Sequence, residues 1–442
     1  SHGHAIAANG LTSWRLQYAC PNIRGEAYTI YTNTPVGGAM RGYGIPQVCF
    51  AIESFMDDVA NEIHMDPLEF RRKNLIQGYY EDAYLKPIAA NTNGIFECLE
   101  KGAEYIHWDE KRKEYAEQAG DVRKGVGMAL FSYKTGVWPI SLEIAGARLS
   151  LNQDGSVQLM LGATEIGQGA DTVFSQMVAE TLHTDMEHVH IKTVQDTDVS
   201  PFDTGAYASR QSFVTGTAVR HCAEILRDKI LAYAKTLLPE IDTRELTLKD
   251  NWIWAGDEQA ISLAALAEES YYSLTNSSVL TAEVSEQVKK NTIATGCCFA
   301  EVEVDIKLGK IKILHIINVH DSGKLLNPQL AEMQVHGGMS MGMGYGISEQ
   351  LILDEKTGRP LNGNLLDYKL MTMLDTPDIK ADFVELCDPM GPYGNKALGE
   401  PPAIPCAPAI RNAVLHATGV AFYENPLTPQ RLIDGFKKAG LI

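Results

Sequence analysis

The stretch CFAEVEVDIKLGKIKILHIINVHD, residues 298–321, contains two segments rich in apolar and β-branched residues, joined by KLGK at 307–310. Two such segments around a short turn containing glycine are typical of a β-hairpin. A second hairpin is predicted where EIAGARLSL (143–151) and SVQLMLGA (156–163) flank the turn sequence NQDG. Antiparallel strand pairs are therefore expected to be a main component of the fold.

Helices are interleaved with these hairpins. Apolar residues recur at helical spacing over 48–63, and a second helix is predicted to start at Pro67, because Asp66 is a good N-cap and proline suits the first helical position. Further segments with helical periodicity are 170–183, 216–238 and the run from Asn327 with its glycine and methionine face, and a strand is expected in EHVHIKTV (187–194). The mixture predicts an α+β class with antiparallel or mixed sheets rather than a doubly wound parallel sheet.

Composition bounds the class of protein. The 442 residues, 45% of them hydrophobic and 21% charged, suffice for two or more globular domains, and a boundary is expected in the irregular stretch 79–92. The net charge of −18 opposes binding to nucleic acid. No apolar run approaches the about 20 residues that span a bilayer, so no membrane association and a cytoplasmic location are expected.

Cofactor motifs of several common kinds are missing from the sequence. The eight cysteines are scattered without a C-x-x-C pair, so neither an iron–sulfur cluster nor a structural zinc site is expected on this chain. No G-x-G-x-x-G follows a predicted strand, which disfavours nicotinamide or flavin binding.

Three glycine-bearing loops lie at strand-to-helix junctions, where backbone amides can approach an anionic ligand. They are AMRGYGIPQ (39–47), GATEIGQGADT (162–172) and FDTGAYASRQS (202–212). Each also has a plainer interpretation as an ordinary turn, with Arg41 a surface cation, Tyr43 a packing residue, and Asp171 and Asp203 cap or turn residues.

A fourth loop, GNKALGEPPAIPCAPAI (394–410), holds Glu400 between Gly399 and Pro401–Pro402. A carboxylate on so rigid a turn is positioned, as a general base must be. The alternative is that Glu400 only stabilises the dipole of the helix that follows.

Taken together and in this order, AMRGYG, GATEIGQGADT, GAYAS, AEMQVHGG and GNKALGEPP resemble the molybdopterin-contacting and catalytic segments of the xanthine dehydrogenase/aldehyde oxidase (molybdenum hydroxylase) family. The resemblance runs over essentially the whole chain and is closest to the molybdenum-binding subunits of bacterial xanthine dehydrogenases. It implies elongated α+β molybdopterin-binding domains with mixed or antiparallel sheets and packed helices. Residues 1–78 would be the carboxy-terminal remainder of the first such domain. Residues 93–442 would be the second, with the Glu400 loop and the C-terminal helices.

The resemblance also assigns roles to single residues. Tyr43 matches an aromatic residue, usually Phe, that stacks on a flat heterocyclic substrate, and Trp138 falls near the second stacking aromatic. Molybdenum would be held through its pterin near Arg41 and Ala206, with no direct protein ligand. The positions that match cofactor contacts are Arg41, Gly42, Gly167, Gln168, Gly169, Ala206, Ser209 and Gln334.

By the same resemblance, Glu400 matches the catalytic base. It would take a proton from a molybdenum-bound hydroxide, which then attacks an electron-poor carbon of the substrate. The implied reaction is hydroxylation of a purine such as hypoxanthine or xanthine with water-derived oxygen. Two alternatives stay open: the same chemistry on another N-heterocycle or an aldehyde, and a non-catalytic scaffold subunit.

Partner chains are implied as well. In the family, two [2Fe–2S] clusters and FAD are carried by other domains or subunits, and the pterin of bacterial relatives often has the cytosine dinucleotide form. A GGGFG-type loop and a substrate-binding Arg precede the point that matches Ser1. We therefore expect the amino-terminal half of the molybdenum subunit, an iron–sulfur subunit and an FAD subunit as partners, in a complex that dimerises. Whether the chain is an engineered fragment, a cleavage product or one half of a split subunit stays open.

Overall fold

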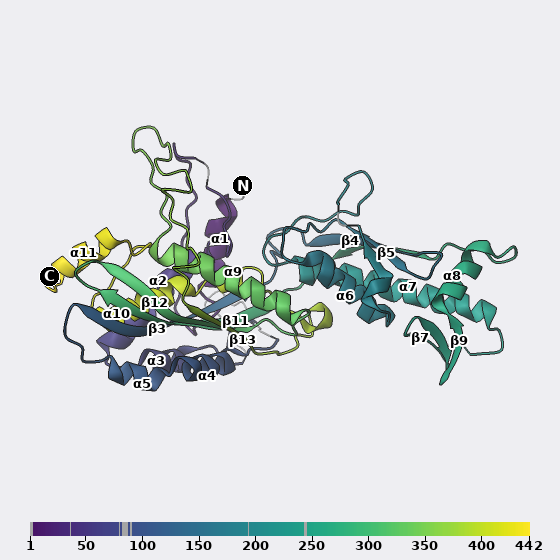
Figure 1. The fold of residues 1–442 in the computed structure, drawn as a ribbon, viewed down its shortest axis with the longest axis horizontal. Coiled ribbons are helices and arrows are strands. Elements are labelled where there is room, and N and C mark those ends of the chain that lie inside the picture. The colour runs from purple at the N-terminus through teal and green to yellow at the C-terminus, as the bar shows by residue number, and fades with distance from the viewer. Residues whose placement is uncertain are drawn as a thin grey trace. The chain divides into compact units, whose positions relative to one another are not determined.

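The computed structural model describes residues 3–35, 37–78, 80–81, 87–88, 91–192, 194–242 and 245–442. The chain divides into two compact units (Figure 1). Unit 1 comprises Ser1–Lys134, Thr292–Asp388 and Lys396–Ile442, and unit 2 comprises Thr135–Asn291 and Pro389–Asn395. The domain boundary predicted within 79–92 falls largely on residues outside the described ranges, and it stays a prediction.

A four-stranded sheet forms the centre of unit 1, in the order β13-β12-β11-β3. Its strands are β3 (Val122–Lys134), β11 (Ile293–Asp305), β12 (Lys310–Asp321) and β13 (Asp378–Phe383). β11 pairs antiparallel with β3 and β12, whereas β13 runs parallel to β12. The hairpin predicted around KLGK is confirmed, and β11 extends it toward the amino terminus.

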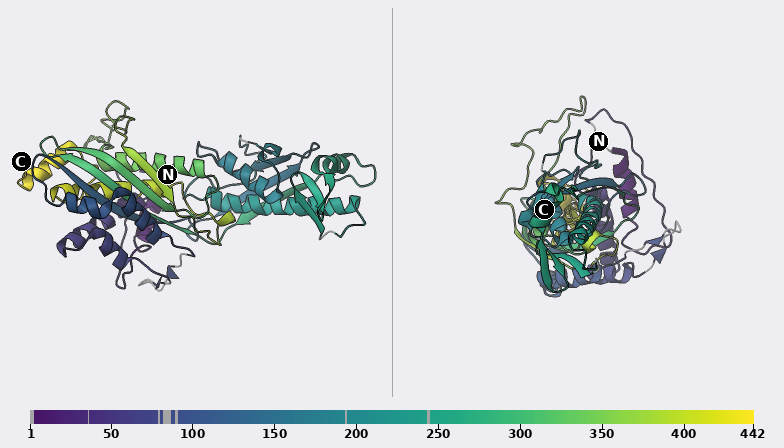
Figure 2. Two further views of the ribbon diagram at one scale, coloured as in Figure 1. Left: turned by 60° about the horizontal axis from the view of Figure 1, so that its bottom comes forward. Right: turned by 90° about the vertical axis from the view of Figure 1, so that its right-hand side faces the viewer.

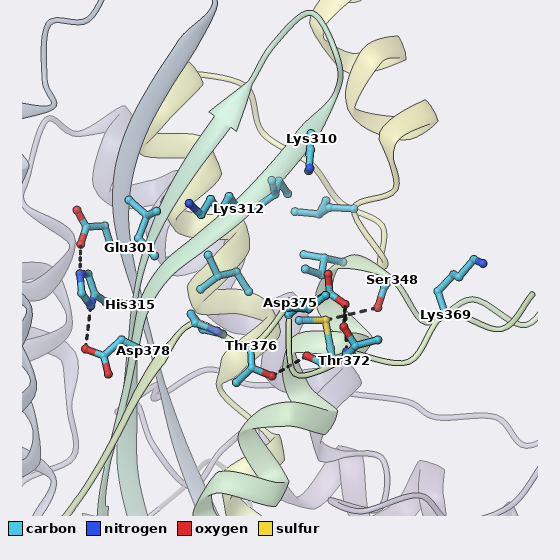
Figure 3. Close-up of a pocket in the computed structure, with 18 of the residues that line it drawn as sticks. Glu301, Lys310, Lys312, His315, Ser348, Lys369, Thr372, Asp375, Thr376 and Asp378 are labelled. Carbon is cyan, nitrogen blue, oxygen red and sulfur yellow. Dashed lines mark hydrogen bonds and ion pairs between the residues drawn. The ribbon is translucent and has the colours of Figure 1, made fainter. Parts of the chain in front are cut away.

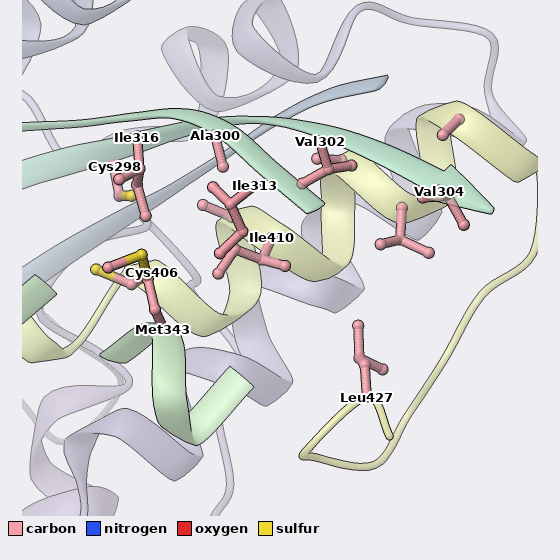
Figure 4. Close-up of a cluster of buried hydrophobic side chains, with 14 of the residues drawn as sticks. Cys298, Ala300, Val302, Val304, Ile313, Ile316, Met343, Cys406, Ile410 and Leu427 are labelled. Atoms are coloured by element: carbon pink, nitrogen blue, oxygen red, sulfur yellow. The ribbon is translucent and has the colours of Figure 1, made fainter. Parts of the chain in front are cut away.

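Both faces of this sheet are covered by helices, which explains why β11 is apolar at nearly every position. Alternate side chains of a strand point to opposite faces. Cys298, Ala300 and Val302 join the core that includes α9 (Pro328–Ile347) and α10 (Cys406–Thr418) (Figure 4). Cys297 and Phe299 join the core that includes α4 (Ile95–Ile106) and α5 (Trp108–Glu114). Figure 2 shows α9 on one side of the sheet and α4 and α5 on the other.

The helix starts predicted from the sequence are largely confirmed. The carboxylate of Asp66 accepts hydrogen bonds from the backbone at the start of α3 (Pro67–Asn74), and the side-chain oxygen of Asn327 caps α9 in the same way. The helix predicted over 48–63 begins at Ile45, because Pro46 fits its first turn. The remaining elements of unit 1 are α1 (Gly3–Ser13), α2 (Ile45–Glu62), α3 (Pro67–Asn74), β1 (Tyr80–Glu81), β2 (Pro87–Ile88), the 3₁₀ turn η5 (Pro401–Ala403) and α11 (Pro429–Lys438).

Unit 2 contains a second four-stranded sheet, in the order β10-β4-β5-β6. The predicted hairpin is confirmed as β4 (Ile144–Leu151) and β5 (Val157–Leu161), with β6 (Val189–Ile191) parallel to β5 and β10 (Thr281–Gln287) antiparallel to β4. The other elements of unit 2 are α6 (Ala170–Leu182), the 3₁₀ turn η1 (Met186–His188), the π-helical turn η2 (Gln211–Thr215), α7 (Gly216–Leu237), β7 (Leu246–Lys249), β8 (Trp252–Ala255), β9 (Glu258–Ser262), α8 (Leu263–Tyr272) and the 3₁₀ turn η4 (Pro392–Gly394).

Each four-stranded sheet combines antiparallel pairs with one parallel pair, so the predicted α+β class with mixed sheets and packed helices is confirmed. None of the described helices combines the length and the apolar character that crossing a lipid bilayer requires.

Candidate active site and cofactor-binding loops

The Glu400 carboxylate lies in unit 1 and is oriented by groups from two distant segments. Tyr133 donates its hydroxyl hydrogen to Oε2 at 2.6 Å, and the backbone N–H of Gly42 donates to Oε1 at 3.3 Å. Glu400 immediately precedes the 3₁₀ turn Pro401–Ala403, yet its side chain does not cap that turn. Glu400 therefore makes no cap hydrogen bond, and the alternative that it only stabilises the dipole of the following helix stays open.

Arg41 ties the turn that carries Glu400 to α9. Its Nε donates to the carbonyl of Gly399 at 2.5 Å, and a terminal nitrogen donates to the carbonyl of Gln334 at 2.8 Å and to its side-chain Oε1 at 3.3 Å. Burial lowers the pKa of Arg41, and the nearby Glu400 carboxylate opposes that shift. Arg41 is thus a partly buried structural cation rather than the surface cation of the plainer interpretation.

The backbone turns sharply at Gly42–Tyr43–Gly44, where φ is +96°, +53° and +90°. A side chain at Gly42 would meet Pro46 Cγ at 2.6 Å, and one at Gly44 would meet the carbonyl of Ile6 at 2.4 Å, so glycine is required at both positions. This bend aims the Gly42 N–H at Glu400. The Tyr43 side chain is buried, and its proposed stacking on substrate stays a prediction.

The glycine face of α9 packs directly against the residues that follow Glu400. A Cβ at Gly338 would lie 2.5 Å from Pro402 Cβ, and one at Gly342 would lie 2.8 Å from the carbonyl of Ala403. The glycine and methionine face of α9 is therefore a surface of close packing. Gln334, on the same helix, is thereby held near Arg41 and the Glu400 turn.

Two groups that orient this loop were missed by reasoning from sequence. One is Tyr133, which lies on β3, a strand that was not among those predicted from the sequence. The other is a buried ion pair between Lys396 Nζ and Asp321 Oδ2 at 2.7 Å, in which Asp321 also accepts from the backbone N–H of Gly94. Both charged side chains are fully buried, and buried charges need partners. A lysine in an otherwise small and apolar loop, and an aspartate that ends an apolar strand, were the available signals.

In unit 2, backbone N–H groups of the loop 162–172 donate hydrogen bonds to the carboxylate of Glu165 in the same loop. Glu165 accepts hydrogen bonds from the backbone N–H groups of Gly167 at 2.7 Å and of Gly169 and Asp171 at 3.1 Å. Burial raises the pKa of Glu165, but these donors outweigh burial and lower the pKa below its usual value. These amides are thus paired with Glu165 in this structure, and the predicted contact of the loop with a cofactor stays a prediction.

The Gln168 side chain folds back onto the same loop. Its Nε2 donates to the carbonyl of Thr164 at 2.9 Å and to Gln211 Oε1 at 2.7 Å. A Cβ at Gly162 would lie 2.9 Å from the backbone nitrogen of Asp203. The loops 162–172 and 202–212 therefore lie side by side within unit 2.

A buried arginine fixes the loop that carries Ala206 and Ser209. Arg210 Nε contacts Glu143 Oε2 at 2.5 Å, and a terminal nitrogen contacts Asp203 Oδ1 at 2.6 Å; all three side chains are buried. Asp203 also accepts from the backbone N–H of Gly205 at 2.8 Å, so its predicted turn role is confirmed alongside an ion pair that was not anticipated.

The same network holds the segment of Trp138. Glu143 Oε1 accepts from the backbone N–H of Val137 at 2.5 Å, and Gly136 N donates to the carbonyl of Ala208 at 2.9 Å. The half-buried Trp138 and the loop 202–212 are consequently positioned by shared contacts.

The predicted site residues are thus divided between the two units, and each set is gathered within its own unit. Unit 1 holds Arg41, Gly42, Tyr43, Gln334 and Glu400. Unit 2 holds Trp138, Gly167, Gln168, Gly169, Ala206 and Ser209.

The loops that carry the predicted contacts offer backbone and amide groups to a cofactor. Across the described ranges, no three His, Cys, Asp or Glu side chains are grouped so that they could hold a metal ion. Ala206 is exposed, and a side chain at Gly167 would meet no atom within 4 Å, so there is open space beside both loops although the Gly167 N–H is paired with Glu165. Gln334 accepts from Arg41 through Oε1, which leaves its amide Nε2 to donate to a ligand. These features suit a molybdopterin contacted by backbone and amide groups.

A hollow of about 820 Å³ lies on unit 1, away from the Glu400 turn (Figure 3). Three of its charged side chains contact one another, since His315 lies 3.4 Å from Asp378 and 3.8 Å from Glu301. Neither Arg41 nor Glu400 lines it. Size alone therefore does not mark the catalytic region.

Comparison with known proteins identifies the family. Residues 101–377 and residues 1–75 each match a family described as a molybdopterin cofactor-binding domain. The chain belongs to the molybdenum hydroxylase family. It is 47% identical over 447 residues to the xanthine dehydrogenase molybdenum-binding subunit of Escherichia coli O157:H7, covering 100% of this chain and 59% of that subunit.

More distant relatives are named for other substrates. The nicotine 6-hydroxylase large subunit of Paenarthrobacter nicotinovorans is 27% identical, over 92% of this chain and 52% of its own length. The aldehyde oxidoreductase of Desulfovibrio gigas has a similar fold, with a TM-score of 0.81 at 24% identity, over 98% of this chain and 45% of that one. The chain therefore spans about half to three fifths of the length of the relatives that it matches.

Proposed function

We propose that this chain contributes the molybdenum site of a hydroxylase that acts on a purine such as hypoxanthine or xanthine, with Glu400 as general base. The observation that carries the proposal is the orientation of Glu400 by Tyr133 and Gly42 beside the partly buried Arg41. The similarity to a xanthine dehydrogenase subunit supports the choice of purine.

In the proposed reaction, Glu400 accepts a proton from the water-derived nucleophile as that nucleophile attacks the substrate carbon. When bound, the molybdenum cofactor supplies the redox chemistry and takes up the electron pair removed from the substrate. Gly42 and Tyr133 hold the carboxylate in the geometry needed to receive the proton. Tyr43 and Trp138 orient the flat ring, which reduces the entropy lost on reaching the reactive geometry.

The contacts to the cofactor are proposed for Arg41, Gly42, Gln334 and for the loops of unit 2 that carry Gly167–Gly169 and Ala206–Ser209. We also propose the cytosine dinucleotide form of the pterin. Electron transfer would proceed through an iron–sulfur subunit and an FAD subunit, and the rest of the molybdenum subunit would complete the site, in a complex that dimerises.

The test is Glu400→Gln in the assembled complex. Loss of a general base typically lowers a rate by about 10²–10⁴-fold, so kcat for xanthine should fall by that factor while molybdenum content is unchanged. Glu349→Gln is a matched control, because Glu349 is a half-buried carboxylate that also accepts from a tyrosine hydroxyl, that of Tyr368, at 2.9 Å. Undiminished turnover by Glu400→Gln would refute the base assignment and favour a non-catalytic scaffold.

The second candidate is the same chemistry on another N-heterocycle or on an aldehyde, favoured by the similarity to a nicotine hydroxylase subunit. Turnover of xanthine, nicotinate and an aromatic aldehyde by one preparation separates the candidates. Absence of xanthine turnover together with turnover of either other substrate would replace the purine proposal.

A further inference from the structure

The Tyr133 side chain is locked by packing around the same turn that carries Glu400. It is 1% exposed and shares a buried cluster with Ala294, Ala397 and Ile404. Ala397 and Ile404 lie on either side of Glu400 in sequence, and Ala294 is the cross-strand partner of Tyr133 on β11. The residues that hold the aromatic ring are thus the residues that flank the carboxylate.

The hydrogen bond from Tyr133 to the Glu400 carboxylate is shorter than the one from Gly42. Its 2.6 Å separation falls in the range of hydrogen bonds between a hydroxyl and an ionised oxygen, whereas the Gly42 N–H lies at 3.3 Å. A hydrogen bond donated to a carboxylate stabilises its ionised form relative to the neutral acid. Only the ionised form can accept a proton from the nucleophile.

We infer that Tyr133 is a positioning residue for Glu400: its hydroxyl orients the carboxylate and keeps it ionised, and so sets the acid limit of the reaction. The inference rests on the proposed role of Glu400 as the base. Because the ring is held by packing, little conformational freedom is lost when the proton is transferred.

The experiment is Tyr133→Phe in the assembled complex, with kcat/KM measured across pH. Since hydrogen bonds to charged groups are strong, the acid limb of the profile should move to higher pH by about 1–2 units, with molybdenum content unchanged. Activity should recover toward the wild-type value at high pH, where the carboxylate is ionised without help. Tyr115→Phe is the matched control, because Tyr115 is buried and donates to the Glu301 carboxylate at 2.8 Å in another core cluster.

A second readout does not depend on turnover. Infrared difference spectra, with the Glu400→Gln spectrum subtracted, report the ionised carboxylate of Glu400 directly. Its protonation midpoint should move upward in Tyr133→Phe by the same amount as the acid limb, and should not move in Tyr115→Phe. A loss of stability alone would lower the amplitude of the signal without moving its midpoint.

The inference would be overturned if the acid limb of kcat/KM and the protonation midpoint of Glu400 were unchanged in Tyr133→Phe. It would also be overturned if both quantities shifted equally in Tyr133→Phe and Tyr115→Phe. The proposed function fails differently, since it is contradicted by full turnover in Glu400→Gln. The two ideas are therefore tested by separate outcomes.

Discussion

At the scale of single residues, unit 1 pairs most of the charges that it buries. Arg71 is fully buried and contacts Glu53 at 2.8 Å and Asp57 at 2.6 Å, and Glu53 also accepts from the Tyr18 hydroxyl at 2.7 Å. His320 is different, because neither ring nitrogen has a hydrogen-bond partner in the part of the chain that the structure describes. Burial, and to a lesser degree the charge of Arg41, lowers the pKa of His320 to about 3.

This depressed pKa predicts an acid sensitivity of the fold. In the unfolded chain the histidine takes up a proton near pH 6.5, whereas in the folded chain it stays neutral down to about pH 3. The unfolded state therefore binds more protons in this window, and the free energy of unfolding should fall by about 1.4 kcal/mol for each pH unit below 6.5. His320→Leu should weaken that pH dependence, measured by urea denaturation at pH 7 and pH 5. His416, whose pKa is also lowered to about 3, is present in both proteins and cancels. If the free energy of unfolding changed by the same amount between pH 7 and pH 5 in the wild-type protein and in His320→Leu, the prediction would be contradicted.

At the scale of elements, α9 connects the cofactor contact predicted for Gln334 to the turn of Glu400. Its glycines permit a separation from Pro402 and Ala403 that any side chain would prevent. A helix normally loses stability by carrying glycine, so the close approach must compensate for that loss.

Adjacent glycines of α9 give a sharp test of this packing. Gly338→Ala places a Cβ 2.5 Å from Pro402 Cβ, and overpacking of this kind typically costs about 1–3 kcal/mol. Gly337→Ala is the matched control, since its Cβ would meet only Arg41 at 3.6 Å, and it should be neutral or stabilising by up to about 1 kcal/mol. Denaturant unfolding of both variants checks the difference. Equal stabilities would show that the Gly338 contact relaxes at no cost.

At the scale of the whole molecule, the chain supplies two sets of predicted site residues but covers only 59% of its relative from Escherichia coli O157:H7. The described residues offer no cluster of three metal-ligating side chains of their own. Retention of metal should therefore depend on the pterin and on the remainder of the molybdenum subunit.

We expect the assembled complex to contain molybdenum and pterin in amounts stoichiometric with this chain, and the isolated chain to retain little of either. Elemental analysis, pterin analysis and mass spectrometry of the co-purifying chains test this together. Stoichiometric molybdenum on the isolated chain would contradict the dependence on partner segments.

The local features of the fold could be read from the sequence because their causes are local. The Asp66 cap, the Asn327 cap and the turn between β11 and β12 depend on residues a few positions apart. The observed boundaries differ from the predicted ones by a few residues. β11, for example, begins at Ile293 rather than at residue 298, because its first residues pair with β3. Glu400 was singled out by the resemblance of several motifs in the right order, because the prolines after it show only that its backbone is restricted.

What surrounds Glu400 was decided by the tertiary structure alone. Tyr133 lies 267 positions away in sequence, Arg41 reaches Gly399 across 358 positions, and the pair of Lys396 with Asp321 spans 75. No periodicity or spacing encodes such contacts, because they arise only when strands pair and helices close over them. The sequence by itself therefore determined which carboxylate to consider, and the packing of β3, α9 and the 396–404 turn determined how that carboxylate is held.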